Sequence, residues 1–261
     1  MGTNLRAALS LLPRSRPADL PGAAPEHSVT VDRAHLAEYD RVCGFPLTDT
    51  LPATYPHVLA FPAAMRLMSA ADFPFPVVGL VHVANRIEQH RPLTAGEPLR
   101  IRVHAENLRA HERGRQFDIV AEAVVDGRAA WRGVSTYLRR AKATTGGGPR
   151  DRAEPPAASA VWRVGARVGA DYAAVSGDHN PIHTSRLGAR LFGFPRPIAH
   201  GMWTAARCLA ALDARLPGAF AVDVAFKLPV PLPATVGFGT DGSAFRVDGR
   251  GPHLAGRVTS I

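Results

Sequence analysis

The sequence predicts an α+β protein in which one unit, a long helix followed by antiparallel strands, occurs twice. Three observations lead to this prediction: an internal repeat, an amphipathic helical pattern, and period-two alternation of apolar residues after that pattern. A segment rich in Gly, Pro and small residues, 144–160, lies between the two copies and is typical of a linker.

The repeat is visible as a direct alignment of the chain with itself. Shifted by 141 positions, residues 64–96 align with residues 205–237 without a gap, and 11 of the 33 positions are identical. The identical pairs include Ala64 with Ala205, Val81 with Val222, and Gly96 with Gly237. A repeat of this kind outranks local cues, because it indicates a duplicated structural unit.

Each copy is predicted to contain one helix and several strands. In the second copy apolar residues recur at spacings of three and four from Met202 to Leu212, and the matching helix of the first copy is expected at 61–71. Residues 220–226 alternate between apolar and other side chains, which predicts a strand. Further strands are expected at 99–103, 117–121, 129–139 and 252–259.

These elements divide the chain into four parts. Residues 1–25 are predicted to be a poorly ordered N-terminal extension, 26–143 the first repeat, 144–160 the linker, and 161–261 the second repeat. The extension includes a short apolar run, 5–12, which is too short and too close to arginine for a membrane span or a secretory signal.

Composition narrows the class of protein further. The net charge of +9 comes mainly from arginine and is spread over both halves, so nucleic-acid binding is not expected. Two cysteines, Cys43 and Cys208, are too few for a disulfide framework and fit buried thiols in a reducing compartment. We therefore expect a cytoplasmic protein without membrane insertion.

The most informative motif runs from Asp171 to His183. It places a carboxyl group, Asp178, five residues before an imidazole, His183, and between them lie Asn180 and Pro181. An Asn-Pro step does not suit a helix interior and favours a turn. The motif therefore predicts a rigid bend that directs two proton-transfer groups to one point.

The segment from Ser176 to His183, followed by Pro197–Met202, resembles the hydratase motif of MaoC-like (R)-specific enoyl-CoA hydratases. The first half, with 54–62 and 73–81, is similar to the N-terminal half of double-hotdog 3-hydroxyacyl-thioester dehydratases of the mycobacterial type. The resemblance implies a double hotdog, in which each repeat is a long helix wrapped by an antiparallel sheet.

The resemblance also implies roles for single residues. Asp178 and His183 match the catalytic pair, and Asn180 matches an asparagine that helps hold the pair and the water. Gly201 matches the glycine whose backbone N–H contacts the thioester oxygen. Other residues near the motif, Tyr172, Ser176 and His200, are candidates for substrate binding or support of the site, although capping or packing explains each of them equally well or better.

The first half lacks the motif, because no Asp there has a His five residues later. One active site per chain follows, and the degenerate half is assigned to keeping the fold and to holding the acyl tail. Packing is the favoured role for Trp203, Phe226, Tyr55, His57 and Phe61, with lining of a tunnel for the acyl chain as the alternative. Three arginines near the motif are candidates for contact with the phosphates of CoA: Arg186, Arg190 and Arg196.

The function implied is reversible syn hydration of trans-2-enoyl thioesters, carried on CoA or acyl carrier protein. Neither a metal nor another cofactor is expected, since no His/Cys cluster has zinc spacing and no Rossmann glycine pattern occurs. The alternatives are a hotdog thioesterase, for which Asp72 or Asp213 would activate water, and a non-catalytic acyl-binding subunit. A monomer that is itself a pseudo-dimer, or a homodimer, is expected.

Overall fold

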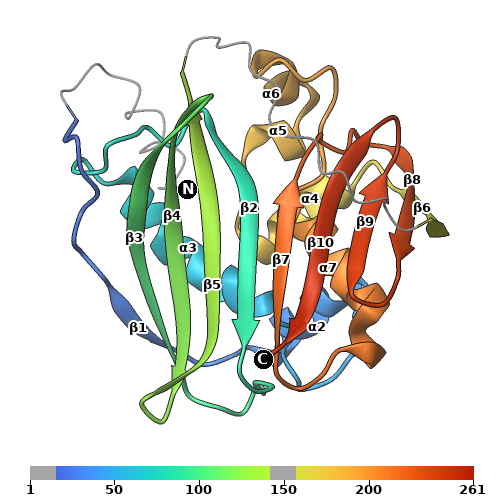
Figure 1. Ribbon diagram of the computed structural model, residues 1–261, viewed down its shortest axis with the longest axis horizontal. Coiled ribbons are helices and arrows are strands. Elements are labelled where there is room, and N and C mark those ends of the chain that lie inside the picture. The colour runs from blue at the N-terminus through green and yellow to red at the C-terminus, as the bar shows by residue number, and fades with distance from the viewer. Residues whose placement is uncertain (1–15, 142–156) are drawn as a thin grey trace.

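The computed structural model describes residues 16–141 and 157–261. Their ten strands form one antiparallel sheet in the order β1-β3-β4-β5-β2-β7-β10-β9-β8-β6 (Figure 1). The strands are β1 (Glu26–Val29), β2 (Leu80–Gln89), β3 (Leu99–His111), β4 (Gly114–Val125), β5 (Arg128–Arg140), β6 (Ala158–Val164), β7 (Phe220–Phe226), β8 (Ala234–Thr240), β9 (Ala244–Asp248) and β10 (Pro252–Ser260).

The helices lie on one side of this sheet, behind it in Figure 1. They are α2 (Arg33–Cys43), α3 (Tyr55–Ser69), α4 (Val168–Ser176), α5 (Pro181–Thr184), α6 (Arg186–Leu191) and α7 (Gly201–Leu212), with the 3₁₀ turn η1 (Asp213–Arg215). No helix in the described ranges is long and apolar enough to cross a membrane.

The strand order confirms the predicted double-hotdog fold. The sheet reads as two five-stranded halves that meet where β2 pairs with β7. In each half a long helix, α3 or α7, is followed along the chain by four of the five strands. Ala84 is paired with Ala225 across the junction, and these two residues are also equivalent in the 141-residue repeat. The repeat is therefore expressed as a local two-fold relation within one chain.

The sequence predicted the bounds of α7 more accurately than those of α3. Helix α7 begins at Gly201, one residue before the predicted start. Helix α3 begins at Tyr55 rather than Phe61 and ends at Ser69, so the predicted range was wrong at both ends. The predicted start at 61 came from alignment with Met202 in the second copy, and α3 extends six residues further toward the N-terminus, with Pro62 in its interior.

A single core of apolar side chains lies between the helices and the sheet, and it runs through both halves. The indole N–H of Trp203 on α7 donates to the carbonyl of Val42 on α2 at 3.1 Å, which ties the second half to the first. Cys43 and Cys208 are both buried free thiols, as predicted. Of the N-terminal extension, residues 1–15 lie outside the described residues, as do residues 144–156 of the expected linker.

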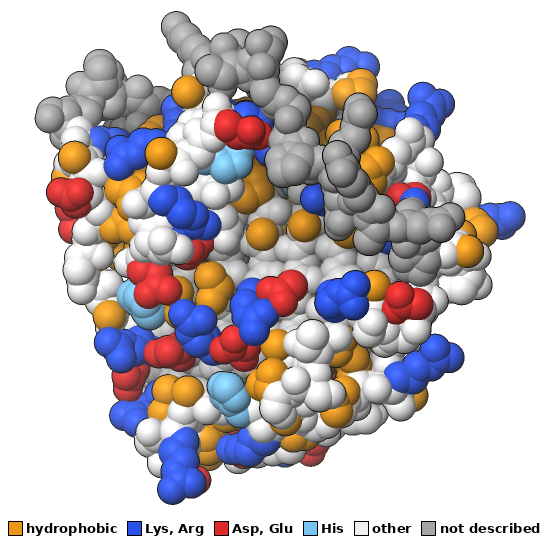
Figure 2. All heavy atoms as spheres, in the orientation of Figure 1, with side chains coloured by type: hydrophobic (Ala, Val, Ile, Leu, Met, Phe, Trp, Pro, Cys, Tyr) orange, Lys and Arg blue, Asp and Glu red, His pale blue; other side chains and the backbone are white. Residues whose placement is uncertain are grey.

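The outward face of the sheet carries acidic and basic side chains in alternation (Figure 2). Arg86 on β2 forms ion pairs with Glu88 and with Asp223 on β7, and Arg132 pairs with Glu106 at 3.3 Å. Such exposed pairs contribute little free energy individually. Part of the arginine excess therefore lies on this solvated surface.

Asp40 on α2 is a fully buried carboxyl group, and it leads to a stability prediction. Burial, and then the charge of Asp213, raise the pKa of Asp40 to about 7, while the backbone of Thr48 opposes the shift. In the unfolded chain this group ionises near its usual value of about 3.9. Between these two pH values Asp40 is ionised in the unfolded chain but neutral in the folded protein. The free energy of unfolding therefore falls progressively as the pH rises from about 4 to 7.

We expect Asp40→Asn to stabilise the protein by about 1–2 kcal/mol more at pH 8 than at pH 4, where Asp40 is neutral in the folded protein and only partly ionised in the unfolded chain. Urea unfolding at the two pH values measures this difference. Asp72→Asn, at an exposed position just after α3, is the matched control and should change neither value. An equal gain at both pH values would contradict the assignment of the effect to ionisation.

Candidate active site

The predicted bend is the junction between α4 and α5. Helix α4 ends at Ser176, and Gly177 adopts a left-handed conformation with φ of 74°, in which its N–H donates to the carbonyl of Ala173. Glycine is suited to this conformation because it has no Cβ. The chain then passes through Asp178 and begins the single-turn helix α5 at Pro181. The motif thus connects two helices through a four-residue turn.

Asn180 is the N-cap of α5. Its side-chain oxygen accepts a hydrogen bond from the backbone N–H of Ile182 at 3.3 Å, and Pro181 takes the first helical position, where no N–H is needed. In the structure, Asn180 thus orients the turn that carries His183. The side chain is exposed, so its observed contact is this cap.

His183 is buried within α5, and its tautomer is determined by one contact. Nδ1 lies 2.8 Å from the carbonyl oxygen of Ile198, and a carbonyl can only accept, so Nδ1 carries the proton and donates. The lone pair is therefore on Nε2. An imidazole oriented in this way is arranged to accept a proton at Nε2.

Asp178 is held by the backbone of its own turn. Its N–H donates to Oγ of Ser176 at 3.2 Å, and its Oδ1 accepts from the backbone N–H of Asn180 at 3.2 Å. The second oxygen, Oδ2, lies 3.8 Å from Nε2 of His200. Ser176 thus supports the turn, and the carboxylate remains about one-third exposed.

His200 is brought to the site by the tertiary structure. Its ring stacks on that of His183 with centroids 3.6 Å apart, and its Nε2–H donates to the backbone carbonyl of Asp178 at 3.0 Å. The buried ring of Tyr172 packs against His200 at 4.9 Å. No sequence spacing predicts this contact, because His200 follows Asp178 by 22 residues and a separate helix, α6, lies between them.

Both imidazoles of the site are neutral at pH 7. Burial lowers the pKa of His183, while the Asp178 carboxylate and the Ile198 carbonyl oppose the shift. Burial, and then the proximity of His183, hold the pKa of His200 well below its usual range. His183 is thus a neutral base that stacks on the neutral ring of His200.

Gly201 is the first residue of α7, directly after His200. His200 makes no side-chain hydrogen bond to the start of this helix, so no side-chain cap occupies the first backbone N–H groups of α7. A Cβ at position 201 would come within 3.0 Å of the Phe226 ring. Glycine therefore allows the close packing of Phe226 against the start of α7.

Two other glycines hold the helices of the site together. A Cβ on Gly169 of α4 would lie 2.0 Å from the backbone oxygen of His183, and a Cβ on Gly188 of α6 would lie 2.4 Å from Cβ of Pro181. Both distances are shorter than any real contact. The backbone of α5, which carries His183, thus sits directly against two helices at positions where no side chain fits. Neither glycine stands out in the sequence, because neither lies at a turn or in a recognisable motif.

Asp178, His183 and His200 also form a potential metal site. Their ligand atoms all lie within 4.8 Å of one another, and carboxylate and imidazole are common ligands of divalent cations. Nε2 of His200, which lies 3.8 Å from the Asp178 carboxylate, already donates to the Asp178 carbonyl, so Nε2 of His183 is the ring nitrogen beside Asp178 that is open to a ligand. The spacing of these residues along the chain did not suggest such a cluster.

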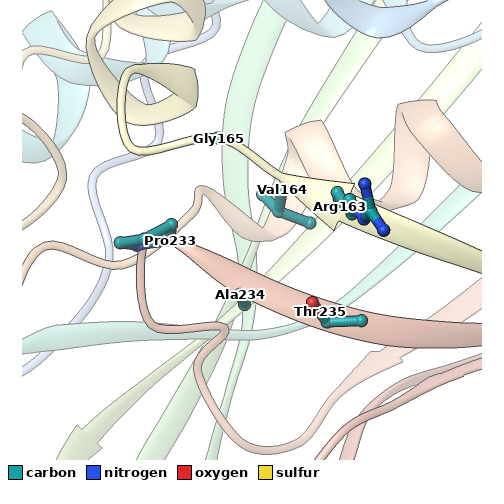
Figure 3. A pocket seen from close by; sticks show the side chains of 6 residues that line it. All are labelled: Arg163, Val164, Gly165, Pro233, Ala234 and Thr235. Atoms are coloured by element: carbon teal, nitrogen blue, oxygen red, sulfur yellow. The ribbon is translucent and has the colours of Figure 1, made fainter.

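An open surface hollow of about 400 Å³ lies at the far edge of the second half, between β6 and the start of β8 (Figure 3). Its lining residues are Arg163, Val164, Gly165, Pro233, Ala234 and Thr235. None of the residues singled out around Asp178 and His183 belongs to this lining. The hollow is therefore separate from the candidate active site.

Comparison with known proteins gives a consistent result. Residues 154–247 match the family model described as the MaoC like domain. The chain is 42% identical to the 3-hydroxyacyl-thioester dehydratase X of Mycobacterium tuberculosis over 89% of this chain and 85% of that protein. It is also 40% identical to the (R)-specific enoyl-CoA hydratase of Aeromonas caviae over 26% of this chain and 54% of that enzyme.

The fold is shared over the whole length with a solved relative. The crystal structure of HtdX of Mycobacterium tuberculosis has a TM-score of 0.81 and 39% identity, covering 92% of this chain and 100% of that chain. A MaoC-like dehydratase from Phytophthora capsici, at 16% identity, has a TM-score of 0.73 over 93% and 96% of the two chains, which reflects the fold alone. The chain therefore belongs to the family of MaoC-like dehydratases.

Proposed function

We propose that this protein is a hydro-lyase that catalyses reversible hydration of trans-2-enoyl thioesters to (R)-3-hydroxyacyl thioesters. The observation that carries the proposal is the geometry around His183: a buried neutral imidazole with its Nε2 lone pair free, beside the Asp178 carboxylate and the uncapped start of α7. The relatives named as dehydratase and hydratase support the same reaction class.

In the hydration direction, a water molecule lies between Asp178 and His183. Nε2 of His183 takes one proton from the water as the oxygen attacks C3 of the enoyl group. The π electrons of the C2–C3 bond move toward the thioester oxygen. The proton held by the pair then passes through Asp178 to C2, which restores both side chains. Because both groups lie on one side of the substrate, the addition is syn.

The negative charge on the thioester oxygen needs a hydrogen-bond donor. The N–H of Gly201, at the start of the 12-residue helix α7, is the proposed donor. The helix dipole adds to the stabilisation there. Loss of one such donor typically costs about 10²–10³ in rate.

His200 is proposed as a positioning residue. Its ring stacks on His183 and its Nε2–H donates to the carbonyl of Asp178, and the ring of Tyr172 supports it in turn.

The thioester carrier, CoA or acyl carrier protein, is left open by the relatives' names, and we propose both as substrates. The thioesterase alternative required a carboxylate on or near the central helix. Asp213 lies in η1, directly after α7, and its charge acts on the buried Asp40 of α2. This contact gives Asp213 a structural environment of its own and does not connect it with the site at His183.

The proposal is tested with purified wild-type protein and trans-2-enoyl-CoA substrates of four to twelve carbons, followed by chiral analysis of the product. We expect hydration with formation of the (R)-3-hydroxyacyl-CoA. Release of free CoA thiol instead would identify a thioesterase. Tight binding of the thioesters without turnover at any chain length would identify a non-catalytic acyl-binding protein.

The pH dependence of hydration should reflect neutral His183 as the base. Because burial lowers its pKa, kcat/KM should be constant around pH 7 and should fall only below the usual histidine value of about 6.5. Steady-state rates with a short enoyl-CoA from pH 5 to pH 8 measure this profile. An acidic limb centred above pH 7 would be inconsistent with His183 as the base in this environment.

A further inference from the structure

Three side chains from the first half of the chain form a cluster of rings beside the second half. They are His57 on α3, His82 on β2 and Tyr137 on β5. The ring of His82 is central: it is nearly parallel to Tyr137 at 4.8 Å and to His57 at 6.2 Å. It also meets the ring of Phe226, from β7, edge-on at 4.9 Å. The cluster therefore spans the junction between the two halves.

A β-bulge in β2 places His82 in this cluster. Asn85 and Ile87 are buried on the helix-facing side of β2, so regular alternation would next put Val83 on that side. The register with β5 shifts between His82 and Ala84, so that His82 lies opposite Tyr137 instead. A bulge of this kind redirects a side chain, and bulges are frequent next to active sites.

The cluster borders the candidate active site. The Phe226 ring lies 3.0 Å from the position that a Cβ would take on Gly201. The ring of Phe61, one turn after His57, lies 3.9 Å from the position that a Cβ would take on Gly177. The charge of Asp178 acts on both His57 and Tyr137. His57, His82, Tyr137 and Phe226 all keep some exposed surface although they lie between the helices and the sheet. Their exposed edges therefore lie close to Asp178 and Gly201.

The two imidazoles of the cluster are neutral. Burial lowers the pKa of His57 to about 4, with the Asp178 charge opposing the shift, and burial followed by the proximity of His57 lowers that of His82 to about 3. Nε2 of His82 is buried and has no hydrogen-bond partner among the described residues. An unpaired buried polar atom is costly, and a phenyl ring would fill the same space without this cost. Because His82 lies beside the candidate active site, this nitrogen is available to a polar group of a bound substrate.

We propose that the exposed edges of this cluster contact the part of the acyl chain beyond C3, and that His82, with His57, binds a hydroxyl group on that chain. The preferred substrates are then 2-enoyl and 3-hydroxyacyl thioesters that carry an additional hydroxyl. A hydroxyl both donates and accepts, so it pairs with either tautomer of His82. This inference rests on the proposed function and names its substrate class.

The test compares trans-2-hexenoyl-CoA with its 5-hydroxy and 6-hydroxy derivatives. We expect wild-type protein to have the higher kcat/KM for at least one hydroxylated substrate. His82→Phe keeps the ring and removes its nitrogens, and it should lower kcat/KM for that substrate by about 3- to 10-fold more than it lowers kcat/KM for the plain substrate. His57→Phe should shift the ratio in the same direction. His82→Gln, which keeps a hydrogen-bonding group, should retain part of the preference.

His104→Phe is the matched control, because His104 is a partly buried histidine of β3 that pairs with Glu106 and has no ring contact with the cluster. It should leave the substrate ratio unchanged. Equal kcat/KM of the wild-type protein for plain and hydroxylated substrates would overturn the inference, as would equal losses for both in His82→Phe, while hydration itself stood. Absence of turnover with all three thioesters would count against the proposed function as well.

Discussion

Asp178→Asn and His183→Ala are each expected to lower the rate of enoyl-CoA hydration by about 10²–10⁴-fold, the usual contribution of general acid–base catalysis. Asn preserves the shape of Asp178 and can still accept the backbone N–H of Asn180, but it cannot relay a proton. Ala at position 183 removes the Nε2 lone pair that the Ile198 carbonyl orients. Steady-state hydration of a short enoyl-CoA measures both effects.

His179→Ala is the appropriate control for these variants, because His179 is exposed and lies within the same turn. It should retain close to wild-type activity. Thermal unfolding of all three variants separates loss of chemistry from loss of fold. If Asp178→Asn and His183→Ala both hydrate at wild-type rates, the proposed mechanism is wrong.

Gly169→Ala is expected to damage the site although it lies in a helix, where Ala usually stabilises by about 0.5–1 kcal/mol relative to Gly. The new Cβ would lie 2.0 Å from the backbone oxygen of His183, so α4 and α5 must separate. Overpacking of this kind costs about 1–3 kcal/mol. Displacement of His183 by about 1 Å should lower kcat by about 10²-fold.

Gly165→Ala is the matched control, since a Cβ at Gly165 meets nothing within 4 Å. It should leave both activity and the unfolding midpoint close to those of the wild-type protein. Urea unfolding and steady-state hydration, measured for both variants, check the prediction. A Gly169→Ala protein that is more stable and fully active would show that α4 and α5 can move apart without consequence for His183.

Much of the fold could be predicted because it depends on short-range patterns. The alternation at 220–226 corresponds to strand β7, Phe220–Phe226, and the repeat predicted the two matched halves. The start of α3 could not be predicted in the same way. Pro56 near its N-terminus and Pro62 in its interior both resemble helix boundaries, and only packing of the helix against the sheet decides between them.

The sequence by itself determined the turn at Asp178, because Gly177, Asn180 and Pro181 have backbone preferences that act locally and need no partner. The tertiary structure alone decided what surrounds that turn. His200 reaches His183 because the segment before α7 packs against α5, where the N–H of Ile198 donates to the carbonyl of Ile182. His82 faces the site only because a bulge shifts the register of β2. Contacts of this kind depend on how separate elements pack, and no residue spacing along the chain encodes them.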